Sequence, residues 1–373
     1  MAIKPLTELT DRGKNTALIP QAMAKIHCFG AGLVGSYVIR YLAGKGHEVH
    51  AYDQQPYRVE GVPGVEVHYV EHDEYPHELI RGSVTDSFVI NMLPGSIGHV
   101  CTTLLAEQPC ALVDLSFSKF TPDRDEQKAR DYGATILWDV GIAPGLSNML
   151  SAHAYRKMGP LRDLKVWVGG NPTGPWGEWK YMAPFSPSDV IEEYTRPARV
   201  IRDGESVVLP ALSDRHTVDV DERGEMEAFL TDGLRSLLNS IPCENMSEYT
   251  VRWPGHIQKF IDHRDSGDLD EFQLIEEWRY DPKVPEFTWL RVLAEGSDGA
   301  IMEWTVQDYG GDDGHSMART TGLVTAICTE AWIEDSKMLP PGVHAPEVLS
   351  DEVLSRVIRE MISHGVEITG PIV

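Results

Sequence analysis

A glycine-rich loop between a short apolar strand and an amphipathic helix constrains this chain more than any other feature. The loop Gly30–Gly35 reads Gly-Ala-Gly-Leu-Val-Gly, follows the predicted strand Lys25–Phe29 and opens the predicted helix Leu33–Gly44. In such a unit the first glycine makes a tight turn, the second lets the backbone approach a pyrophosphate, and the third lets helix and strand pack closely. The N–H groups at the start of the helix attract the phosphates. The loop therefore predicts a dinucleotide-binding domain.

The residue that ends the next predicted strand indicates which dinucleotide fits. The strand Glu48–Tyr52 runs into Asp53, and two glutamines rather than an arginine follow. A carboxylate here accepts hydrogen bonds from the adenine ribose hydroxyls and repels a 2′-phosphate, which favours NAD over NADP. The predicted cofactor-binding residues of this part are Gly30, Gly32, Leu33, Val34 and Asp53. The alternative is a Rossmann-like fold that binds no cofactor.

Short apolar runs alternate with helical patterns as far as residue 150, which predicts a parallel sheet covered on both faces. The further strands are expected at Val65–Val70, Ser87–Met92, Ala111–Leu115 and Thr135–Trp138, with a helix at Ile97–Glu107. Ligands of such sheets bind at the carboxyl ends of the strands. The loops there add Leu93, Pro94, Asp114, Ser116, Asp139, Gly141, Ala143 and Pro144 as cofactor-binding candidates. Ordinary turn chemistry is the alternative interpretation of these Pro- and Gly-containing loops.

The pattern changes after residue 160, and the chain is expected to form a second domain. Strands are predicted at Val166–Val168 and Tyr249–Trp253 and as a pair at Thr288–Leu293 and Ile301–Val306, and helices at Asp232–Asn239, Ser316–Ile333 and Glu352–His364. The predicted fold class is α/β: a doubly wound Rossmann sheet with a second α+β domain for substrate binding or dimerisation. The expected division is an arm over 1–24, the Rossmann domain over 25–150, the α+β domain over 151–314, and helices over 315–373 that return to the Rossmann domain.

Composition excludes several partners. The 57 acidic residues against 33 Lys and Arg give a formal net charge of −24, which repels phosphate backbones and anionic membranes, so we expect neither nucleic acid nor lipid as a partner. A saline habitat and plain solubility both explain such a surface. The N-terminus lacks a secretory pattern, and the five cysteines are scattered without a CxxC pair. We interpret them as reduced thiols of a cytoplasmic protein.

Several motifs in order resemble the saccharopine dehydrogenase and lysine 6-dehydrogenase family. The matching segments are Asp139–Asn148, Glu193–Ile201, Asp232–Arg235, Arg252–His256 and Ser316–Gly322. The resemblance, closest to lysine 6-dehydrogenases, implies NAD-dependent oxidation of the carbon bearing a side-chain amine, with release of ammonia and a semialdehyde that cyclises to piperideine-6-carboxylate. The alternative is a saccharopine- or carboxynorspermidine-type enzyme that reduces an imine with NAD(P)H, and a cofactor-sensing protein without catalysis is a third. Relatives also suggest a homodimer.

One segment departs from the family pattern as the resemblance presents it. Where many members carry Tyr-Lys-x-x-Trp-Ser-Pro, this chain has Tyr181–Pro187, with Met182 in place of the cation and Phe185 in place of the tryptophan. The substrate here therefore differs if that cation binds a carboxylate in relatives. The aromatic residues around this segment either wall a water-free pocket or form ordinary core.

The proposed chemistry selects candidate residues on the matching segments. A substrate carboxylate suits an arginine fork, for which Arg235, Arg252 and Arg196 are candidates, with structural ion pairs as the alternative. Asp232 is a candidate for the substrate ammonium, or a helix N-cap. His256 is the first candidate for a base or water positioner and Tyr181 the second, although most histidines are simply packed or solvated.

A histidine-rich acidic stretch raises the question of a metal. His68, His72 and His77 lie within 68–78, but their spacing matches no known site. We interpret the stretch as a solvated loop and predict no metal, which hydride transfer does not need.

Overall fold

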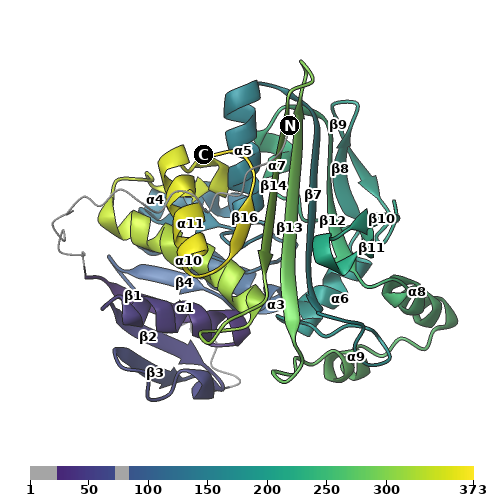
Figure 1. Ribbon diagram of the computed structural model, residues 1–373. Coiled ribbons are helices and arrows are strands. Elements are labelled where there is room, and N and C mark those ends of the chain that lie inside the picture. The colour runs from purple at the N-terminus through teal and green to yellow at the C-terminus, as the bar shows by residue number, and fades with distance from the viewer. Residues whose placement is uncertain (1–22, 72–83) are drawn as a thin grey trace. The chain divides into compact units, whose positions relative to one another are not determined.

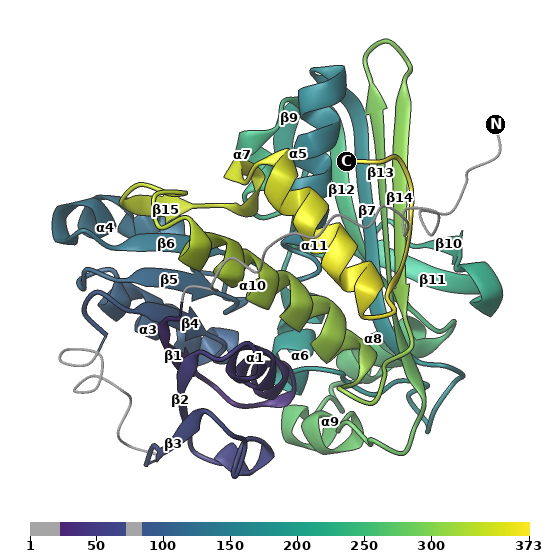
Figure 2. The same cartoon turned by 60° about the vertical axis from the view of Figure 1, so that its left-hand side comes forward.

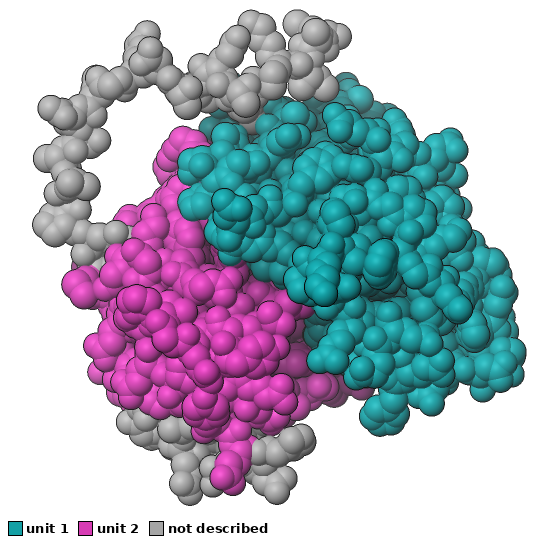
Figure 3. Space-filling model, turned by 60° about the horizontal axis from the view of Figure 1, so that its bottom comes forward, with its two compact units in different colours: residues 1–3, 142–320, 361–373 teal, residues 4–141, 321–360 magenta. Residues whose placement is uncertain are grey.

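The computed structural model describes residues 23–71 and 84–373, and these divide into two compact units (Figure 3). The parallel-sheet unit comprises residues 23–71, 84–141 and 321–360. The mixed-sheet unit comprises residues 142–320 and 361–373. Each unit is therefore built from segments that are distant in the sequence.

The parallel-sheet unit is organised around seven parallel strands in the order β15-β6-β5-β4-β1-β2-β3 (Figure 1). Their bounds are β1 Lys25–Phe29, β2 Glu48–Asp53, β3 Val65–Tyr69, β4 Phe88–Asn91, β5 Ala111–Asp114, β6 Thr135–Trp138 and β15 Gly342–His344. Central strands such as β6 are buried at every residue, as continuous apolar runs in a parallel sheet predict. The order reverses between β1 and β4, which is where such sheets bind ligands.

Helices pack on this sheet and on one another (Figure 2). They are α1 Leu33–Gly44, α3 Gly95–Leu105 and α4 Glu126–Tyr132, joined by most of α10 Ser316–Glu334 and α11 Asp351–Ser363. Helices α1 and α10 approach closely, because a Cβ on Gly322 would collide with the ring of Tyr37. The hydroxyl of Thr325 donates to the carbonyl of Val140 over 2.7 Å, which ties α10 to the chain just after β6.

The mixed-sheet unit holds a nine-stranded sheet with the main order β10-β11-β12-β7-β13-β14-β16, while β8 pairs with β12 and β9. Its strands are β7 Leu161–Pro172, β8 Ala198–Arg202, β9 Glu205–Leu209, β10 His216–Asp219, β11 Glu225–Leu230, β12 Cys243–Arg252, β13 Glu286–Gly296, β14 Ile301–Asp308 and β16 Glu367–Thr369. Strand β7 pairs in parallel with β12 and antiparallel with β13. The sheet is therefore mixed.

Helices of this unit are α5 Leu146–Met158, α6 Pro187–Thr195, α7 Leu237–Ser240, α8 His256–Ser266 and α9 Glu271–Glu277. Aromatic and aliphatic side chains from α6, α8 and α9 and the segments between them form one buried cluster, which includes Trp179, Tyr181, Tyr194, Phe260 and Trp278. Trp179 and Tyr181 are thus core, as one of the two interpretations expected, whereas Trp176 is 47% exposed.

The predicted fold class is confirmed. No predicted strand end of the parallel sheet moves by more than one residue, and the helix Leu33–Gly44 is reproduced. The strands predicted at Thr288–Leu293 and Ile301–Val306 do pair, as the longer β13 and β14. The domain boundaries stay a prediction; they were drawn as continuous segments, whereas the compact units are discontinuous.

The helix predicted at Asp232–Asn239 is wrong, because only Leu237–Ser240 is helical. Arg235 has φ 53°, in the left-handed region, which an α-helix cannot contain. Asp232 consequently caps no helix, and its carboxylate instead binds Arg199.

Other expectations meet the structure only in part. The loop predicted from residue 68 is wrong at its start, since His68 lies on β3, while His72 and His77 and residues 1–22 of the predicted arm lie outside the described residues. All five cysteines are described and none forms a disulfide. Among the described helices, none is long and apolar enough to cross a membrane.

Candidate functional site

The glycine loop between β1 and α1 has the geometry of a dinucleotide cradle. Gly30 has φ +96°, donates to the carbonyl of Tyr52 over 2.9 Å, and would place a Cβ 2.7 Å from the carbonyl oxygen of Met92. A Cβ on Gly35 would collide with the carbonyl of Gly30. The first and third glycines are thus required by the packing of the protein itself.

Gly32 differs from its two neighbours in the motif. A Cβ on Gly32 would meet nothing within 4 Å, and its φ is −66°. Packing and backbone conformation therefore give no reason for a glycine here, whereas a ligand phosphate approaching the backbone does. Gly32 is also the N-cap of α1, with no side chain capping the helix. The first N–H groups of α1, including those near Leu33 and Val34, are oriented as an anion site requires.

Asp53 lies at the end of β2 beside this loop. Its two carboxylate oxygens accept the backbone N–H groups of Ala31, over 2.6 Å, and Gln55, over 2.7 Å. The side chain is half-buried. These bonds orient the carboxylate next to the glycine turn while leaving further lone pairs for ligand hydroxyls. The residues of the loop and Asp53 together fit the adenosine end of a dinucleotide.

The loops after β4 and β5 are held together mainly by internal contacts. Asp114 accepts the hydroxyl of Thr102 and the backbone N–H of Ser116, and Asn91 donates to Thr102 over 3.0 Å. Both carboxylate oxygens of Asp114 are thus engaged, and the side chain is 2% exposed. A cofactor at Asp114 and Ser116 would therefore have to be bound by backbone groups of their loop rather than by the Asp114 carboxylate.

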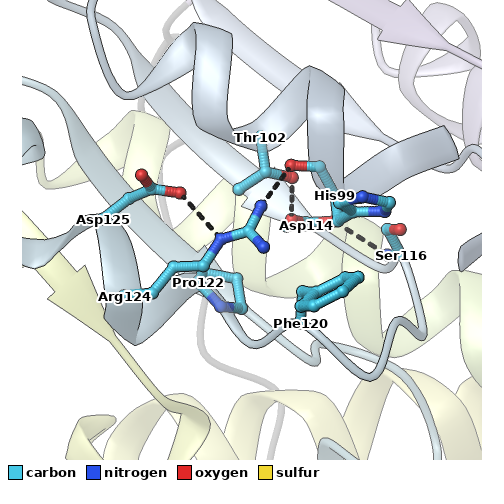
Figure 4. Close-up of a pocket in the computed structure, with 8 residues that line it drawn as sticks. All are labelled: His99, Thr102, Asp114, Ser116, Phe120, Pro122, Arg124 and Asp125. Carbon is cyan, nitrogen blue, oxygen red and sulfur yellow. Dashed lines mark hydrogen bonds and ion pairs between the residues drawn. The ribbon is translucent and has the colours of Figure 1, made fainter.

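A small pocket beside these residues is lined by side chains that include Asp114, Ser116 and Arg124. In Figure 4 the Arg124 side chain crosses it, donating to the carbonyl of His99 over 3.1 Å and lying 5.1 Å from the ring centre of Phe120. The adjacent loop Leu93-Pro94 starts α3, where a Cβ on Gly95 would collide with the carbonyl of Phe117. Gly95 is thus required by the close packing of two loops, and the cofactor role of Leu93 and Pro94 stays a prediction.

The loop after β6 carries the chain from one unit into the other. Asp139 has φ 57° and is 4% exposed, and Gly141 ends the first long segment of the parallel-sheet unit. The peptide bond between Ala143 and Pro144 is cis, and α5 follows with Asn148 accepting the N–H of Gly145 over 3.0 Å. The cofactor role of this loop stays a prediction.

A chain of hydrogen bonds runs through the core of the mixed-sheet unit. Arg252 donates through Nε to the hydroxyl of Tyr194 over 2.7 Å, and that hydroxyl lies 2.9 Å from Nε2 of His256. Nδ1 of His256 lies 2.8 Å from the carbonyl of Trp179. Since a carbonyl only accepts, Nδ1 carries the proton and Nε2 accepts from Tyr194.

This arrangement changes the interpretation of His256. The side chain is 1% exposed and both ring nitrogens have partners. Burial, and then the charge of Arg252, lower the pKa of His256 to about 3. A group so acidic is a poor general base near neutral pH. The structure therefore speaks against His256 as the base and places it in a buried hydrogen-bond chain with Tyr194 and Arg252.

Two carboxyl groups near this chain have pKa values shifted into the neutral range. Burial raises the pKa of Glu193 to about 7, although Arg252, whose Nη2 lies 3.9 Å away, opposes the shift. Burial, followed by the charge of Glu193, raises the pKa of Glu248 to about 8. Glu248 accepts the hydroxyl of Thr231 over 2.9 Å. Buried carboxyls with such values are candidates for proton transfer at neutral pH.

The arginine and aspartate candidates have partners within the unit. Arg252 is 2% exposed, with its guanidinium 4.5 Å from the ring centre of Tyr181. Arg196 donates to Glu192 over 2.6 Å. Asp232 accepts Nε and Nη2 of Arg199 over 2.8 and 2.9 Å. The structure therefore favours structural ion pairs for these residues over direct contacts with a substrate.

The two remaining candidates are also buried. Arg235 is 2% exposed, in the left-handed backbone conformation noted above. Tyr181 is 1% exposed, and burial raises the pKa of its hydroxyl to about 12. That hydroxyl has no hydrogen-bond partner in the part of the chain that the structure describes. Tyr181 is thus the one predicted catalytic side chain whose polar atom is not already used by a structural bond.

Glu193, Tyr194 and Glu248 were missed in the sequence. Glu193 and Tyr194 lie inside the matching segment Glu193–Ile201, so the motif itself contained the signal. Glu248 carries no such signal; it becomes notable because β12 pairs beside β7 and buries its side chain, 5% exposed, in the unit.

The segment Ser316–Gly322 begins α10 and forms a second buried polar cluster. Glu286 of β13 accepts the backbone N–H of Ser316 over 2.6 Å, and Asp308 of β14 accepts Nε of Arg319 over 2.9 Å. Carboxylates of the neighbouring strands thus accept hydrogen bonds from a backbone N–H and a side chain in the first turns of α10. The polar residues of this motif thus have a structural use.

Comparison with known proteins gives a consistent result. Residues 141–366 match the model of the saccharopine dehydrogenase C-terminal domain. A curated relative, alpha-aminoadipic semialdehyde synthase of Arabidopsis thaliana, is 25% identical over 155 residues, which are 40% of this chain and only 14% of that protein's length. The apo saccharopine dehydrogenase (L-Glu forming) of Saccharomyces cerevisiae superposes with a TM-score of 0.69 at 17% identity, covering 94% of this chain and 100% of that one. The superposition shows a shared fold.

Proposed function

The chain belongs to the saccharopine dehydrogenase family, whose C-terminal domain model covers more than half of it, and from this we propose that it is an NAD-dependent amino acid dehydrogenase. Two observations carry the proposal. The space above the Cα of Gly32 is open, and the backbone N–H of Ala31 orients the carboxylate of Asp53. When bound, the nicotinamide would accept a hydride from the carbon that bears the substrate amine. Gly30, Gly32 and Asp53 would hold the adenosine half.

We assign the removal of a proton from the substrate amine to a residue of the mixed-sheet unit. A substrate amine must be neutral before its carbon gives up a hydride, so a base with a pKa near neutrality is needed. Glu193, with its pKa raised to about 7 by burial and its side chain 16% exposed, is the group that meets this requirement best. Nη2 of Arg252 lies 3.9 Å from Glu193, while its Nε donates to Tyr194 and its guanidinium lies 4.5 Å from the ring centre of Tyr181.

We propose L-lysine as the substrate, oxidised at its side-chain amine carbon, because the motifs resemble lysine 6-dehydrogenases most closely. The test is to mix the full chain with NAD and L-lysine and follow absorbance in the NADH band, with release of ammonia as a second readout. Replacing Glu193→Gln should lower kcat by about 100-fold or more, while the exposed Glu222→Gln should not change it. Full activity in the Glu193 variant would remove it from the mechanism.

A second candidate function is oxidation of a secondary amine of the saccharopine type. It is favoured by the family match itself and by the substitution of Met182, 1% exposed, for the cation of relatives. Turnover with saccharopine, or NAD(P)H-dependent reduction of the imine that an aldehyde and an amine form with loss of water, in the absence of turnover with lysine would select it. No reaction with either class, with NAD still bound, would favour a cofactor-sensing protein.

We further propose a cytoplasmic homodimer without a nucleic-acid or membrane partner. The acidic composition and the free cysteines support this environment. Light scattering on the eluting peak of a gel-filtration column measures the mass and decides the oligomeric state.

A further inference from the structure

The two strands at one edge of the parallel sheet bring together two histidines and a glutamate that are well separated in the sequence. Strands β2 and β3 pair in parallel so that His50 lies opposite Glu66 and Tyr52 opposite His68. The side chains of His50, Glu66 and His68 therefore share one face of the sheet. The strands lie side by side in Figure 1.

The potential ligand atoms of these residues face one another. Nδ1 of His50 lies 3.0 Å from Nε2 of His68. The two carboxylate oxygens of Glu66 lie 3.5 Å from that His50 nitrogen and 3.6 Å from that His68 nitrogen. Ligands bonded to one tetrahedral ion at about 2.0–2.1 Å are separated by about 3.3 Å. The spacing of the three groups is close to that of a first coordination shell.

The outer contacts of the imidazoles support the same orientation. Nε2 of His50 lies 2.9 Å from a carboxylate oxygen of Glu48, so it carries the proton and the lone pair of Nδ1 points into the cluster. A histidine that binds a metal commonly donates its other nitrogen to a carboxylate in this way. The ring of His68 stacks on that of Tyr52, with ring centres 4.5 Å apart, which fixes its plane.

We propose that His50, Glu66 and His68 form a binding site for one divalent transition-metal ion, with Zn²⁺ as the preferred ion. Two imidazoles and a carboxylate are ligands that suit zinc. His50 is 6% exposed, whereas the side chain of Glu66 is 64% exposed, so an ion enters from solvent and keeps water at its remaining position. This proposal differs from the sequence-based expectation that no metal binds in this region. That expectation considered the spacing of residues along one segment and not across two paired strands.

A bound ion would fasten the edge strand to the sheet. Among the strands that the structure describes, β3 pairs with β2 alone, and its residues are half-buried or exposed. The ion would link β2 to β3 near Asp53, the residue assigned to the adenine ribose. Its effect on the protein is therefore stabilisation of this edge, separate from the proposed hydride transfer.

The test is titration of the metal-stripped full chain with Co²⁺ in the absence of NAD. Co²⁺ takes the place of Zn²⁺ and reports its ligand geometry through visible absorption. We expect saturation at one equivalent, displacement by Zn²⁺, and a higher melting temperature with either ion. His68→Gln and Glu66→Gln should abolish the band or weaken affinity at least tenfold, and Glu48→Gln should weaken it by about 10–100-fold.

His344→Gln is the matched control, because His344 lies on β15, the opposite edge strand of the same sheet. It should bind Co²⁺ like the unmodified chain. The proposal is overturned if no band forms, if the band survives in both His68→Gln and Glu66→Gln, or if His344→Gln abolishes it. Glu66 is exposed, so its variant keeps the test valid even if His68→Gln does not fold.

Discussion

The glycine loop with Asp53 and the hydrogen-bond chain of Arg252 are polar regions built in opposite ways. In the loop, the protein offers backbone N–H groups and leaves space above Gly32. In the mixed-sheet unit, Arg252, Tyr194 and His256 satisfy one another and are at most 2% exposed. The first region has the shape that the proposed cofactor needs, whereas the polar groups of the second are already bonded to one another.

The difference teaches that matching a family motif does not make each polar residue a contact for substrate. Arg252 and His256 lie on the same motif, yet burial turns both into supports. Burial raises the pKa values of Glu193 and Glu248 to about 7 and about 8. These two carboxyl groups are therefore the candidates in that region for proton transfer near neutral pH. Four measurements test this contrast.

The largest effect is expected from Arg252→Met. Removing the guanidinium leaves Glu193 and the hydroxyl of Tyr194 buried without their cationic partner, which costs about 3–5 kcal/mol of unfolding free energy. Urea unfolding measures the loss. Arg264→Met, whose partner Asp265 is exposed, should change stability by less than about 1 kcal/mol. If the stability is unchanged and the KM for the substrate is raised, Arg252 binds the substrate carboxylate, as the sequence predicted.

The next effect is a dependence of stability on pH that Glu248→Gln should reduce. Burial, followed by the charge of Glu193, raises the pKa of Glu248 in the folded protein to about 8, above an unfolded value of about 4.3. The folded state therefore holds a proton that the unfolded state releases. This contribution to stability is fully present below pH of about 4.3 and is lost as pH rises through about 8.

The variant should consequently lose less unfolding free energy than the unmodified chain between pH 5 and pH 8. The difference is on the order of 1.4 kcal/mol for each pH unit in this window. Urea unfolding at three pH values measures it, with the exposed Glu222→Gln as control. Parallel curves for all three proteins would show that Glu248 titrates normally.

Asp53→Ala tests the glycine loop with Asp53. Loss of a carboxylate that binds two ribose hydroxyls should weaken NAD binding by about 10–100-fold and reduce the preference over NADP. Calorimetry with each dinucleotide measures both effects, and Asp123→Ala, exposed in the same unit, serves as the control. Equal NAD affinity in the two variants would contradict the assignment.

The smallest effect is expected from Gly32→Ala. The added methyl group meets no protein atom, so folding should be unaffected, but it enters the space assigned to the pyrophosphate and should weaken NAD binding about tenfold. Gly44→Ala is matched to it, since a Cβ there also meets nothing within 4 Å. A normal affinity in both variants would mean that no phosphate approaches Gly32.

Six of the seven strands of the parallel sheet could be predicted because their determinants are local, whereas β15 lies in a region where only helices were expected. Short apolar runs such as Lys25–Phe29 and Thr135–Trp138 were recovered to the residue, since a buried strand needs continuous apolar sequence. The helix at Asp232–Asn239 could not be excluded, because the left-handed conformation of Arg235 and the pairing of Asp232 with Arg199 depend on a distant strand.

The sequence by itself determined the glycine turn, the helix that follows it and the carboxylate that ends β2, because these are specified by residues within one short stretch. Only the tertiary structure decided which polar groups are supports and which are reactive, since a pKa depends on burial and on charges contributed by remote segments. The meeting of His50 with Glu66 and His68 has the same origin: strand pairing, which spacing along the chain does not reveal, sets their distances.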